Sequence, residues 1–315
     1  MSGRDVRRLA ARATTSTHHD KQLQITRLVL GALEQGVEEV VLIDEPFRIS
    51  RRAVENLSVK QKLTFIASAI THTANDTVEL VEQMRDLGCQ VIIVMGGDGT
   101  SRIVARTWPD AVILPVSTGT NNVFPKMIEP SVAGAAAGLV ATGKLDYQRV
   151  ASRCKQIHIR TPQRTDLALV DAVLVRDDSL GNMLPFEAHK ISTLLLAISE
   201  PAAVGMSPIG GFTLPCLPQD DFGVLIHCGE PASYKLRVPI SPGLYDDISI
   251  RSAEPVALGQ EIEIQGPGIL AFDGDRELAL SPTDRGWLSV KRDGPWVLDA
   301  RQVLQAAASK KILRR

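Results

Sequence analysis

The arrangement of apolar residues changes near Asp146, and this change constrains the fold more than any other feature of the sequence. Before Asp146, segments with apolar residues at helical spacing alternate with short apolar runs typical of buried strands. After it, short β-rich runs follow one another between turns rich in Pro and Gly. The first pattern predicts a parallel sheet covered by helices, and the second predicts an antiparallel sandwich or barrel. We therefore expect an α/β domain over residues 1–146, a β-sandwich domain over 147–292, and a helical segment over 293–315 that packs back on the first domain.

The same patterns predict the individual elements. In the first domain, helices are expected at residues 23–35, 73–88, 100–107 and 131–143, and short apolar or strand segments at 39–43, 63–69, 90–95 and 111–116. The helix at 131–143 is rich in Ala and Gly, which favours tight packing on a sheet. In the β-rich part, strands are expected at 156–160, 167–176, 190–199, 222–227, 234–239, 247–250, 261–265, 269–272 and 287–291. A final helix is expected at 299–313.

The charge balance and the cysteines limit the class of protein. The sequence has 35 Lys and Arg against 36 Asp and Glu, a net charge of -1. Proteins that bind nucleic acid or an anionic membrane favour a strongly basic surface, so neither partner is expected here. The four widely spaced cysteines suit a reducing cytosol, without a structural disulfide or zinc site. The longest apolar stretch, residues 132–141, is about half as long as a bilayer span requires. We expect a cytoplasmic protein.

One glycine-rich segment, Gly96-Gly97-Asp98-Gly99-Thr100, directly follows a predicted strand and opens a predicted helix. Glycines let the backbone approach a ligand closely, and the free N–H groups of a helix start bind phosphate. Thr100 is expected to cap this helix through its hydroxyl. An Asp beside phosphates is unfavourable unless it accepts a proton or holds a metal, so Asp98 is the candidate catalytic residue. The alternative is a tight turn in which Asp98 makes only local hydrogen bonds.

A second polar loop, Ser117-Thr118-Gly119-Thr120-Asn121-Asn122, follows the next predicted strand. Loops at the carboxyl ends of neighbouring parallel strands meet in the crevice where open α/β sheets bind ligands. Its hydroxyls, amides and backbone N–H groups suit phosphates. Near the N-terminus, Arg4 and Arg8 share a helical face and are candidates for gripping phosphates, with an exposed basic face as the alternative.

These two loops resemble the nucleotide-binding motifs of the superfamily that joins NAD kinases, diacylglycerol kinases and sphingosine kinases. In that group a GGDGT loop is followed by a Gly/Asn-rich loop and, in a β-sandwich domain, by an Asp-Gly turn, which Phe272-Asp273-Gly274-Asp275 resembles here. The sequence from Ser2 to Leu9 is similar to the ATP-NAD kinase-like acetoin catabolism protein X subgroup. The resemblance implies a Rossmann-like first domain and an NAD kinase-like fold.

The resemblance also implies roles for the matching residues. Asp98 would act as general base or hold a metal, and ATP with Mg²⁺ would be the phosphoryl donor. The residues that would contact the nucleotide and its phosphates are Gly96, Gly97, Gly99, Thr100, Thr118, Gly119, Thr120, Asn121 and Asn122. Asp273 and Gly274 would lie at or near the cleft. Assembly into a homo-oligomer through the β domain is expected from the same source.

Departures from the family pattern affect the acceptor side of the site. NAD kinases carry an Asn-Glu pair where this sequence has Val170-Asp171, so the acid is kept and the amide is lost. Their T-P-T-G-S-T-A-Y stretch corresponds to residues 199–211, where the proline and the closing glycines match but the Gly-Ser-Thr-Ala-Tyr core does not. Asp171 and Ser199 are therefore candidate acceptor-binding residues. The family also has a strand before the turn that Ser2-Gly3 matches, so we expect either a sheet that lacks this strand or a longer chain.

Two functions of different classes follow. The first is an ATP-dependent kinase that transfers a phosphoryl group to a hydroxyl of NAD or a related small molecule, mainly by positioning and charge neutralisation. The second is a non-catalytic, regulatory nucleotide-binding protein that has kept the phosphate loops without NAD kinase activity. The metal remains open at this point.

Overall fold

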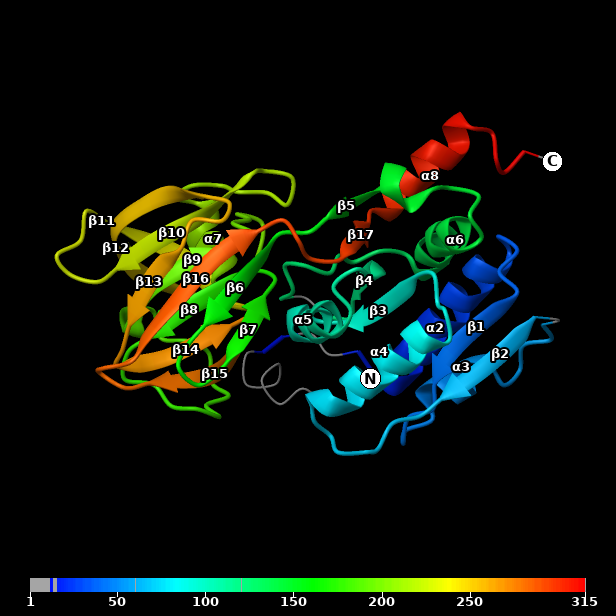
Figure 1. Ribbon diagram of the computed structural model, residues 1–315, viewed down its shortest axis with the longest axis horizontal. Helices are drawn as coiled ribbons and strands as arrows, with labels where there is room; N and C mark the ends of the chain where they lie inside the picture. The colour runs from blue at the N-terminus through cyan, green and yellow to red at the C-terminus, as the bar shows by residue number, and fades with distance from the viewer. Residues whose placement is uncertain (1–11, 14–15, 60, 120, 315) are drawn as a thin grey trace.

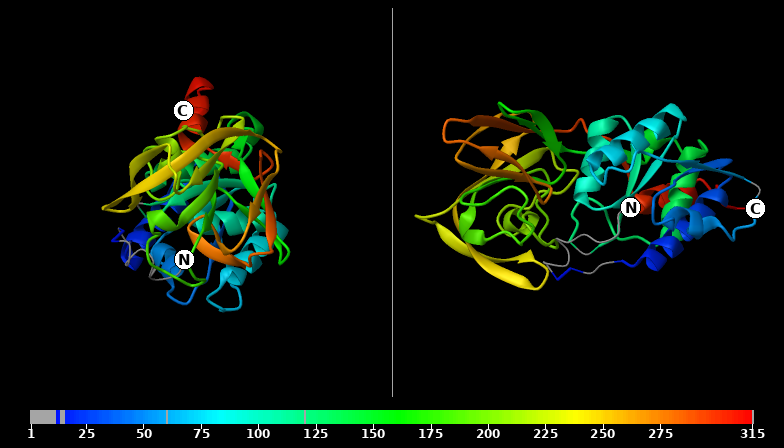
Figure 2. Two further views of the ribbon diagram at one scale, coloured as in Figure 1. Left: turned by 90° about the vertical axis from the view of Figure 1, so that its left-hand side faces the viewer. Right: turned by 90° about the horizontal axis from the view of Figure 1, so that it is seen from below.

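The computed structural model describes residues 12–13, 16–59, 61–119 and 121–314. These residues form two domains side by side along the long axis of the molecule (Figure 1). The right-hand view of Figure 2 shows that one half is made mostly of strands, whereas the other half combines most of the helices with further strands. The candidate nucleotide residues Arg4, Arg8 and Thr120 lie outside the described residues.

The first domain alternates helices and strands, as the sequence predicts. Its helices are α2 (His18–Leu33), α3 (Ile49–Val54), α4 (Ala74–Asp86), α5 (Asp98–Thr107), α6 (Pro130–Ala141) and α8 (Ala300–Ser309). Its strands are β1 (Glu39–Ile43), β2 (Lys62–Ile66), β3 (Ile92–Gly96), β4 (Val112–Ser117), β5 (Ala151–Arg153) and β17 (Trp296–Leu298). Strands β1 and β2 pair in parallel, and a separate sheet has the order β3-β4-β17-β5. The predicted parallel pairing is confirmed by β3 with β4 and by β4 with β17.

Helices cover both faces of the β3–β4 sheet. On one face, Leu28 of α2, Ala136 of α6 and Val303 of α8 pack in one cluster with residues of β4. On the other face, Val81 of α4 and Val104 of α5 pack with β3 and β4. This layering explains why β4 is buried along its whole length. No helix among the described residues is long and apolar enough to cross a membrane.

The small residues of α6 serve a close crossing with α2 as well as packing on the sheet. A Cβ atom added at Gly134 would lie 2.1 Å from the carbonyl oxygen of Leu28. One added at Gly31 would lie 2.4 Å from the carbonyl oxygen of Ser131. Both approaches are too short for any side chain, so glycine is needed where the two backbones meet. The predicted tight packing of this helix is therefore directed mainly at another helix.

The second domain is built from antiparallel strands, and the predicted sandwich is confirmed. Its elements are β6 (Gln156–Arg160), β7 (Thr165–Ala168), β8 (Asp171–Val175), β9 (Ile191–Leu196), α7 (Ser207–Gly211), β10 (Phe222–Cys228), β11 (Tyr234–Ser241), β12 (Leu244–Ala257), β13 (Ile262–Gln265), β14 (Gly268–Phe272), β15 (Asp275–Leu280) and β16 (Arg285–Lys291). The larger sheet has the order β11-β12-β10-β9-β8-β14-β15, and the smaller has the order β13-β16-β6-β7. Short 3₁₀ turns lie at Tyr147–Arg149 and Ala188–Lys190.

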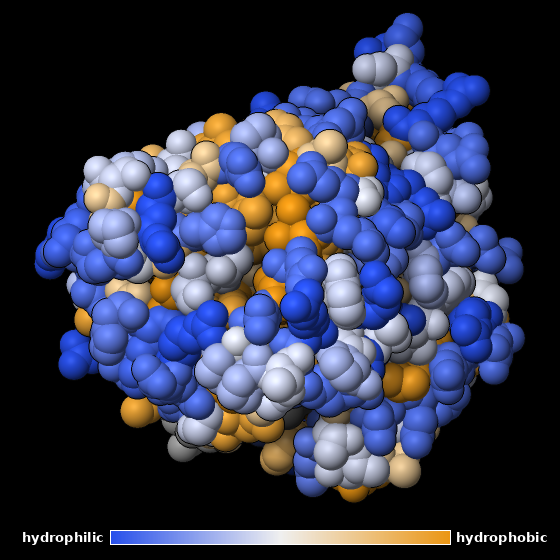
Figure 3. All heavy atoms as spheres, turned by 60° about the vertical axis from the view of Figure 1, so that its left-hand side comes forward, coloured by the Kyte–Doolittle hydropathy of each residue, from blue (hydrophilic) through white to orange (hydrophobic). Residues whose placement is uncertain are grey.

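Apolar side chains fill the space between these two sheets. Ile159 of β6, Leu288 of β16 and Leu270 of β14 belong to one buried cluster. A second cluster lies on the other face of the larger sheet, where Ile209 of α7 meets Leu194 and Ile226. The outer face drawn in Figure 3 is mostly hydrophilic, with apolar residues visible in a band near its upper centre. Some apolar surface of this kind is ordinary for a folded chain.

Two neighbouring connections join the domains. The chain leaves the first domain after β5 and returns through β17, and these strands pair antiparallel (Figure 1). The amide of Cys154 donates to the carbonyl of Pro295, and a Cβ added at Gly294 would lie 2.5 Å from the Cys154 sulfur. The crossing therefore lies between β5 and β6, somewhat later than the boundary expected after residue 146.

Candidate functional site

The glycine-rich segment forms the junction between β3 and α5. Strand β3 ends at Gly96, Gly97 is the N-cap in an extended conformation, and α5 begins at Asp98. The expectation that Thr100 caps this helix is wrong, because Gly97 holds that position and makes no side-chain cap. Asp98 instead occupies the first turn of α5, where the helix dipole favours a negative charge.

Close approach, not unusual backbone angles, explains the glycines here. None of Gly96, Gly97 and Gly99 has a positive φ. A Cβ added at Gly96 would lie 2.7 Å from Oγ1 of Thr100, and one at Gly99 would lie 3.2 Å from a carboxylate oxygen of Asp275. The segment is therefore packed tightly against its own helix and against the second domain.

The Asp98 carboxylate points into the protein and links the two predicted loops. Its Oδ1 accepts the amide hydrogens of Phe124 at 2.8 Å and Val123 at 3.2 Å, just beyond the second loop. Burial of the carboxylate, followed by the negative charge of Asp273, raises the pKa of Asp98 to about 7. The backbone hydrogen bonds oppose this rise but do not cancel it. A carboxylate with such a pKa exchanges protons near neutral pH.

The second loop is ordered by its own side chains. The hydroxyl of Ser117 donates to the carbonyl of Gly119 at 2.6 Å and accepts from the amide nitrogen of Asn122 at 2.7 Å. Ser16, just before α2, donates to the carbonyl of Thr118 at 2.9 Å. The side-chain oxygen of Asn121 is buried and has no hydrogen-bond partner among the described residues. A buried acceptor of this kind is suited to a ligand hydroxyl or amino group.

The Asp273-Gly274 turn is a two-residue hairpin between β14 and β15. Both residues have positive φ, 50° and 84°, which is the type I′ geometry that Asp-Gly favours. The Asp273 carboxylate accepts the amide hydrogens of Leu169 at 2.9 Å and Val170 at 2.8 Å. It thus holds the connection between β7 and β8 in the same way that Asp98 holds the end of the second loop.

Asp171 begins β8, next to this connection. It is buried, and burial together with the charges of Asp273 and Asp98 raises its pKa well above the ordinary value. Burial also raises the pKa of Asp273, although the nearby Arg102 opposes the rise. The mutual effects show that the structure brings together Asp98 of the first domain with Asp171 and Asp273 of the second. The sequence analysis placed Asp273 at or near the cleft only by resemblance, and it did not group the three acids.

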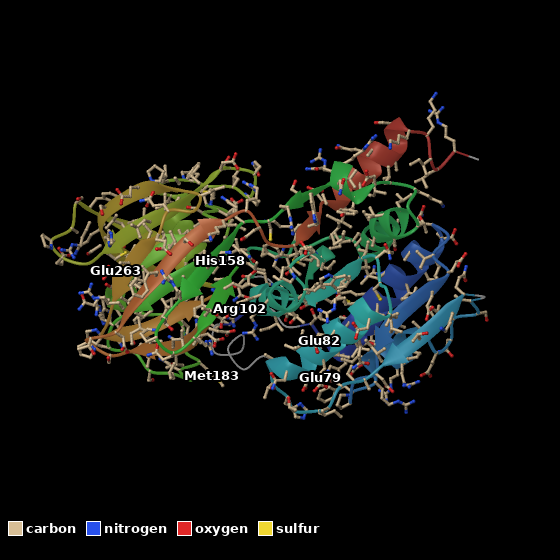
Figure 4. All side chains as sticks on the ribbon, viewed as in Figure 1. Glu79, Glu82, Arg102, His158, Met183 and Glu263 are labelled. Atoms are coloured by element: carbon tan, nitrogen blue, oxygen red, sulfur yellow. The ribbon has the colours of Figure 1, made fainter. Side chains whose placement is uncertain are left out.

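Arg102 of α5 is the residue that the sequence analysis missed. It lies on α5 at the junction of the two domains (Figure 4). Its guanidinium contacts Glu277 at 2.6 Å, Asp275 at 3.4 Å and Asp273 at 4.0 Å, with only 4% of its side chain exposed. It also stacks 4.7 Å from the centre of the Phe272 ring. Its position four residues after Asp98, on the same helical face, was the available signal.

Further ion pairs hold α5 to the second domain. Arg106 lies 3.5 Å from Asp166 of β7, and Arg164 lies 3.0 Å from Asp166 and 2.7 Å from Glu277. Two of the nitrogens of Arg102, Nε and Nη1, are buried without a hydrogen-bond partner among the described residues. The junction therefore combines several acids with one buried arginine, Arg102, whose hydrogen bonds are not all satisfied.

Ser199 makes its hydrogen bonds away from the three acids. It is fully buried, and its hydroxyl donates to the carbonyl of Leu214 at 3.0 Å. A Cβ added at Gly210 would lie 2.2 Å from this hydroxyl, so the residue packs against α7. Ser199 exposes no surface to an acceptor in this arrangement.

Mg²⁺ was expected to accompany ATP. No group of three or more His, Cys, Asp or Glu side chains is arranged to hold a metal ion in the described part of the chain. Asp98, the nearest candidate ligand to the phosphate loop, already accepts two backbone hydrogen bonds. The described residues therefore offer no preformed metal site.

Two family models match most of this chain. The family model of the ATP-NAD kinase N-terminal domain matches residues 12–145, and that of the acetoin catabolism protein X C-terminal domain matches residues 155–293. Acetoin catabolism protein X of Cupriavidus necator is 30% identical over 299 residues, which cover 90% of this chain and 83% of that protein.

Among solved structures, yeast NADH kinase complexed with NADH has a TM-score of 0.53 at 11% identity and covers 90% of this chain and 82% of its own. An NAD kinase from Archaeoglobus fulgidus in complex with ATP has a TM-score of 0.42 at 13% identity, over 87% of this chain and 98% of that one. The yeast structure shows that the fold is shared. The family models, and the sequence identity over most of both proteins, show the family. This chain belongs to the acetoin catabolism protein X family of ATP-NAD kinase-like proteins.

Proposed function

We propose that this protein is an ATP-dependent kinase that transfers a phosphoryl group to a hydroxyl of NAD or a related small molecule. The observation that carries the proposal is Asp98, whose pKa is raised to about 7 at the carboxyl end of β3, beside the helix start of α5. The match to the ATP-NAD kinase N-terminal domain supports NAD as the first acceptor to test.

The nucleotide would lie over the two loops. The free N–H groups at the start of α5 favour phosphate oxygens, and Gly97 leaves room for them to approach the backbone. The unpartnered oxygen of Asn121 would accept a hydrogen bond from a ribose hydroxyl or an amino group of the base.

Asp98 would act on the acceptor hydroxyl. The oxygen of the acceptor hydroxyl would attack the γ-phosphorus of ATP. The bond from that phosphorus to the bridging oxygen of ADP would break, and the hydroxyl proton would pass to the Asp98 carboxylate. The Oδ1 of Asp98 accepts from Phe124 at 2.8 Å and from Val123 at 3.2 Å, and Oδ2 receives one contact, from Val123 at 3.2 Å. One oxygen therefore remains available for the proton. Positioning contributes most of the rate in phosphoryl transfer.

The direct test is Asp98→Asn, assayed with labelled ATP and a panel of NAD, NADH, nucleosides and polyols. Loss of a general base lowers turnover by about 10²- to 10⁴-fold, and we expect a loss of this size with the fold retained. Asp86→Asn on the exposed end of α4 is the matched control and should keep full activity. Near-normal turnover of Asp98→Asn would sink the proposal.

The second candidate is a non-catalytic nucleotide-binding protein. Two observations favour it: the Asp98 carboxylate is already engaged by backbone amides, and the Ser199 hydroxyl is buried away from any acceptor. This function predicts that ATP, NAD or NADP raises the melting temperature while no acceptor yields a phosphorylated product. If any acceptor in the panel yields a phosphorylated product, and Asp98→Asn no longer forms it, the protein is a kinase and the second candidate is wrong.

A further inference from the structure

The candidate nucleotide site is rich in negative charge. Asp98, Asp171 and Asp273 each raise the energy of a neighbouring carboxylate through their charges. Arg102 of α5 directs its guanidinium to acids of the second domain, with Glu277 at 2.6 Å. A nucleoside triphosphate adds further negative charge, and phosphoryl transfer depends on neutralising that charge. A site of this composition therefore needs a second cation on the side of the phosphates.

Lys126 lies beside the site because its backbone is tied to the end of β4. Its amide donates to the carbonyl of Pro115 at 3.4 Å, and its carbonyl accepts from the amide of Ser117 at 2.9 Å. Val116 and Lys126 also form an isolated parallel bridge. The second loop, residues 117–122, therefore leaves β4 and returns to it, and Lys126 closes the return at the carboxyl end of the strand.

The side chain of Lys126 turns back toward the loop. Its ammonium nitrogen donates to the carbonyl of Val123 at 3.0 Å, and the amide of Val123 donates to the Asp98 carboxylate at 3.2 Å. Val123 therefore links the ammonium group to the candidate catalytic acid. The positive charge of Lys126 also acts on Asp98, because it opposes the rise in the pKa of that carboxyl.

This ammonium group is available to a ligand. Lys126 is exposed, and the one hydrogen bond that its side chain makes among the described residues goes to an uncharged carbonyl. An ammonium group has three N–H donors, so two remain for the oxygens of a ligand. Lysine is a common phosphate ligand because it presents a compact positive charge.

We propose that Lys126 is the phosphate-binding cation of the nucleotide site, and that its ammonium group contacts an oxygen of the donor's polyphosphate chain. The inference rests on the proposed function for the class of ligand, a nucleoside triphosphate. Lys126 faces the phosphates from the end of the second loop, and the free N–H groups at the start of α5 face them from the first. The contact offsets the repulsion between the phosphates and the acids of the site.

The test measures nucleotide affinity by titration calorimetry, which needs no phosphoryl transfer. Lys126→Met removes the charge and keeps an unbranched stem, and it should weaken ATP binding by about 10- to 100-fold, the contribution of a hydrogen bond to a charged group. Lys126→Arg keeps the charge and should recover most of the affinity. Adenosine carries no phosphate, so its affinity should be the same for the wild-type protein and both variants.

Lys144→Met is the matched control. Lys144 is also exposed, and its ammonium group also donates to a backbone carbonyl, that of Gln35 at 2.6 Å. It follows the end of α6, however, whereas Lys126 precedes the start of that helix, which is about 18 Å long. Lys144→Met should therefore bind ATP as tightly as the wild-type protein.

Equal ATP affinity of Lys126→Met and the wild-type protein would overturn the assignment of Lys126. A loss of the same size for adenosine would also overturn it, because the side chain would then only shape the loop. A wild-type protein that binds no ATP would overturn the proposed function together with this assignment. The wild-type titration therefore distinguishes a failure of the function from a failure of Lys126 alone.

Discussion

Asp98 in the first domain and Asp273 in the second do the same local task with different consequences. Each carboxylate accepts two neighbouring backbone amides from a segment far away in the sequence, Val123 and Phe124 in one case and Leu169 and Val170 in the other. Asp273 is buried beside the guanidinium of Arg102, whereas Asp98 is half-buried at a helix start. The guanidinium of Arg102 forms an ion pair with Asp273, at 4.0 Å.

This difference separates a structural acid from a reactive one. Burial raises the pKa of Asp273 as well, but Arg102 and the backbone amides oppose that rise, and its hydrogen bonds fix the junction of the domains. Burial and the negative charge of Asp273 disfavour the charged form of Asp98 and raise its pKa to about 7, so its proton exchanges near pH 7. In the proposed function, Asp273 therefore stabilises the site and Asp98 acts in it.

The largest expected effect comes from removing the structural acid. Asp273→Ala leaves the amides of Leu169 and Val170 without an acceptor and takes one carboxylate from Arg102. Removing a buried carboxylate from two amides and an arginine lowers the free energy of unfolding by about 3–5 kcal/mol. Urea unfolding measures it, with Asp247→Ala on the exposed β11–β12 hairpin as the control that should unfold normally. An equal, small effect of both substitutions would remove the distinction between the two acids.

Arg102→Met should have the next largest effect. It keeps an unbranched apolar stem but removes the guanidinium, which leaves Asp273, Asp275 and Glu277 without their shared cation. Because Asp275 and Glu277 are partly exposed and can be hydrated, we expect a loss of about 2–3 kcal/mol. Arg102→Lys should recover only part of it, since an ammonium group lacks the planar fork and the stacking on Phe272. If Arg102→Lys were as stable as the wild-type protein, the planar fork and the stacking of the guanidinium would not contribute to stability.

The smallest expected effect is a pH dependence specific to Asp98. Its pKa is raised in the folded state, so the folded protein holds more protons than the unfolded chain between about pH 4 and 7. The contribution of Asp98 to stability therefore falls as pH rises through this window and levels off above it. After allowance for the solvent that reaches this half-buried residue, we expect about 1–2 kcal/mol.

Asp98→Asn should remove this part of the pH dependence. The measurement is the free energy of unfolding against pH for the wild-type protein and for Asp98→Asn, and the difference between the two curves. In the active enzyme, phosphoryl transfer should rise with pH through about 7, because a general base works in its deprotonated form. A wild-type protein whose stability curve coincides in shape with that of Asp98→Asn would show that the carboxyl titrates normally.

Local features of the fold could be predicted from the sequence. Strands β1 and β6 were expected at the residues where they occur, because continuous or alternating apolar runs bounded by turn residues are read locally. The helix expected at 73–88 occurs as α4, with Thr73 as its N-cap. Asp273-Gly274 forms a turn for the same reason, since its backbone angles depend on two residues.

Elements that depend on distant partners were missed. Strands β5 and β17 have three residues each and exist because they pair with each other and with β4. Strand β15 carries alternating charges, Arg276 and Glu277 among them, and its pairing with β14 was hidden by that polarity. Short helices α3 and α7 have too few turns to show a helical period.

The sequence by itself determined the two domain types, the strand–loop–helix unit around Gly96–Thr100 and the identity of Asp98 as a candidate, because each depends on neighbouring residues. Only the tertiary structure decided that Asp98, Asp171 and Asp273 share one site and that Arg102 holds it together. It also decided that Val123 links Lys126 to Asp98. These are relations between residues far apart in the chain, and burial, which sets the charge of each acid, arises only when the two domains pack together.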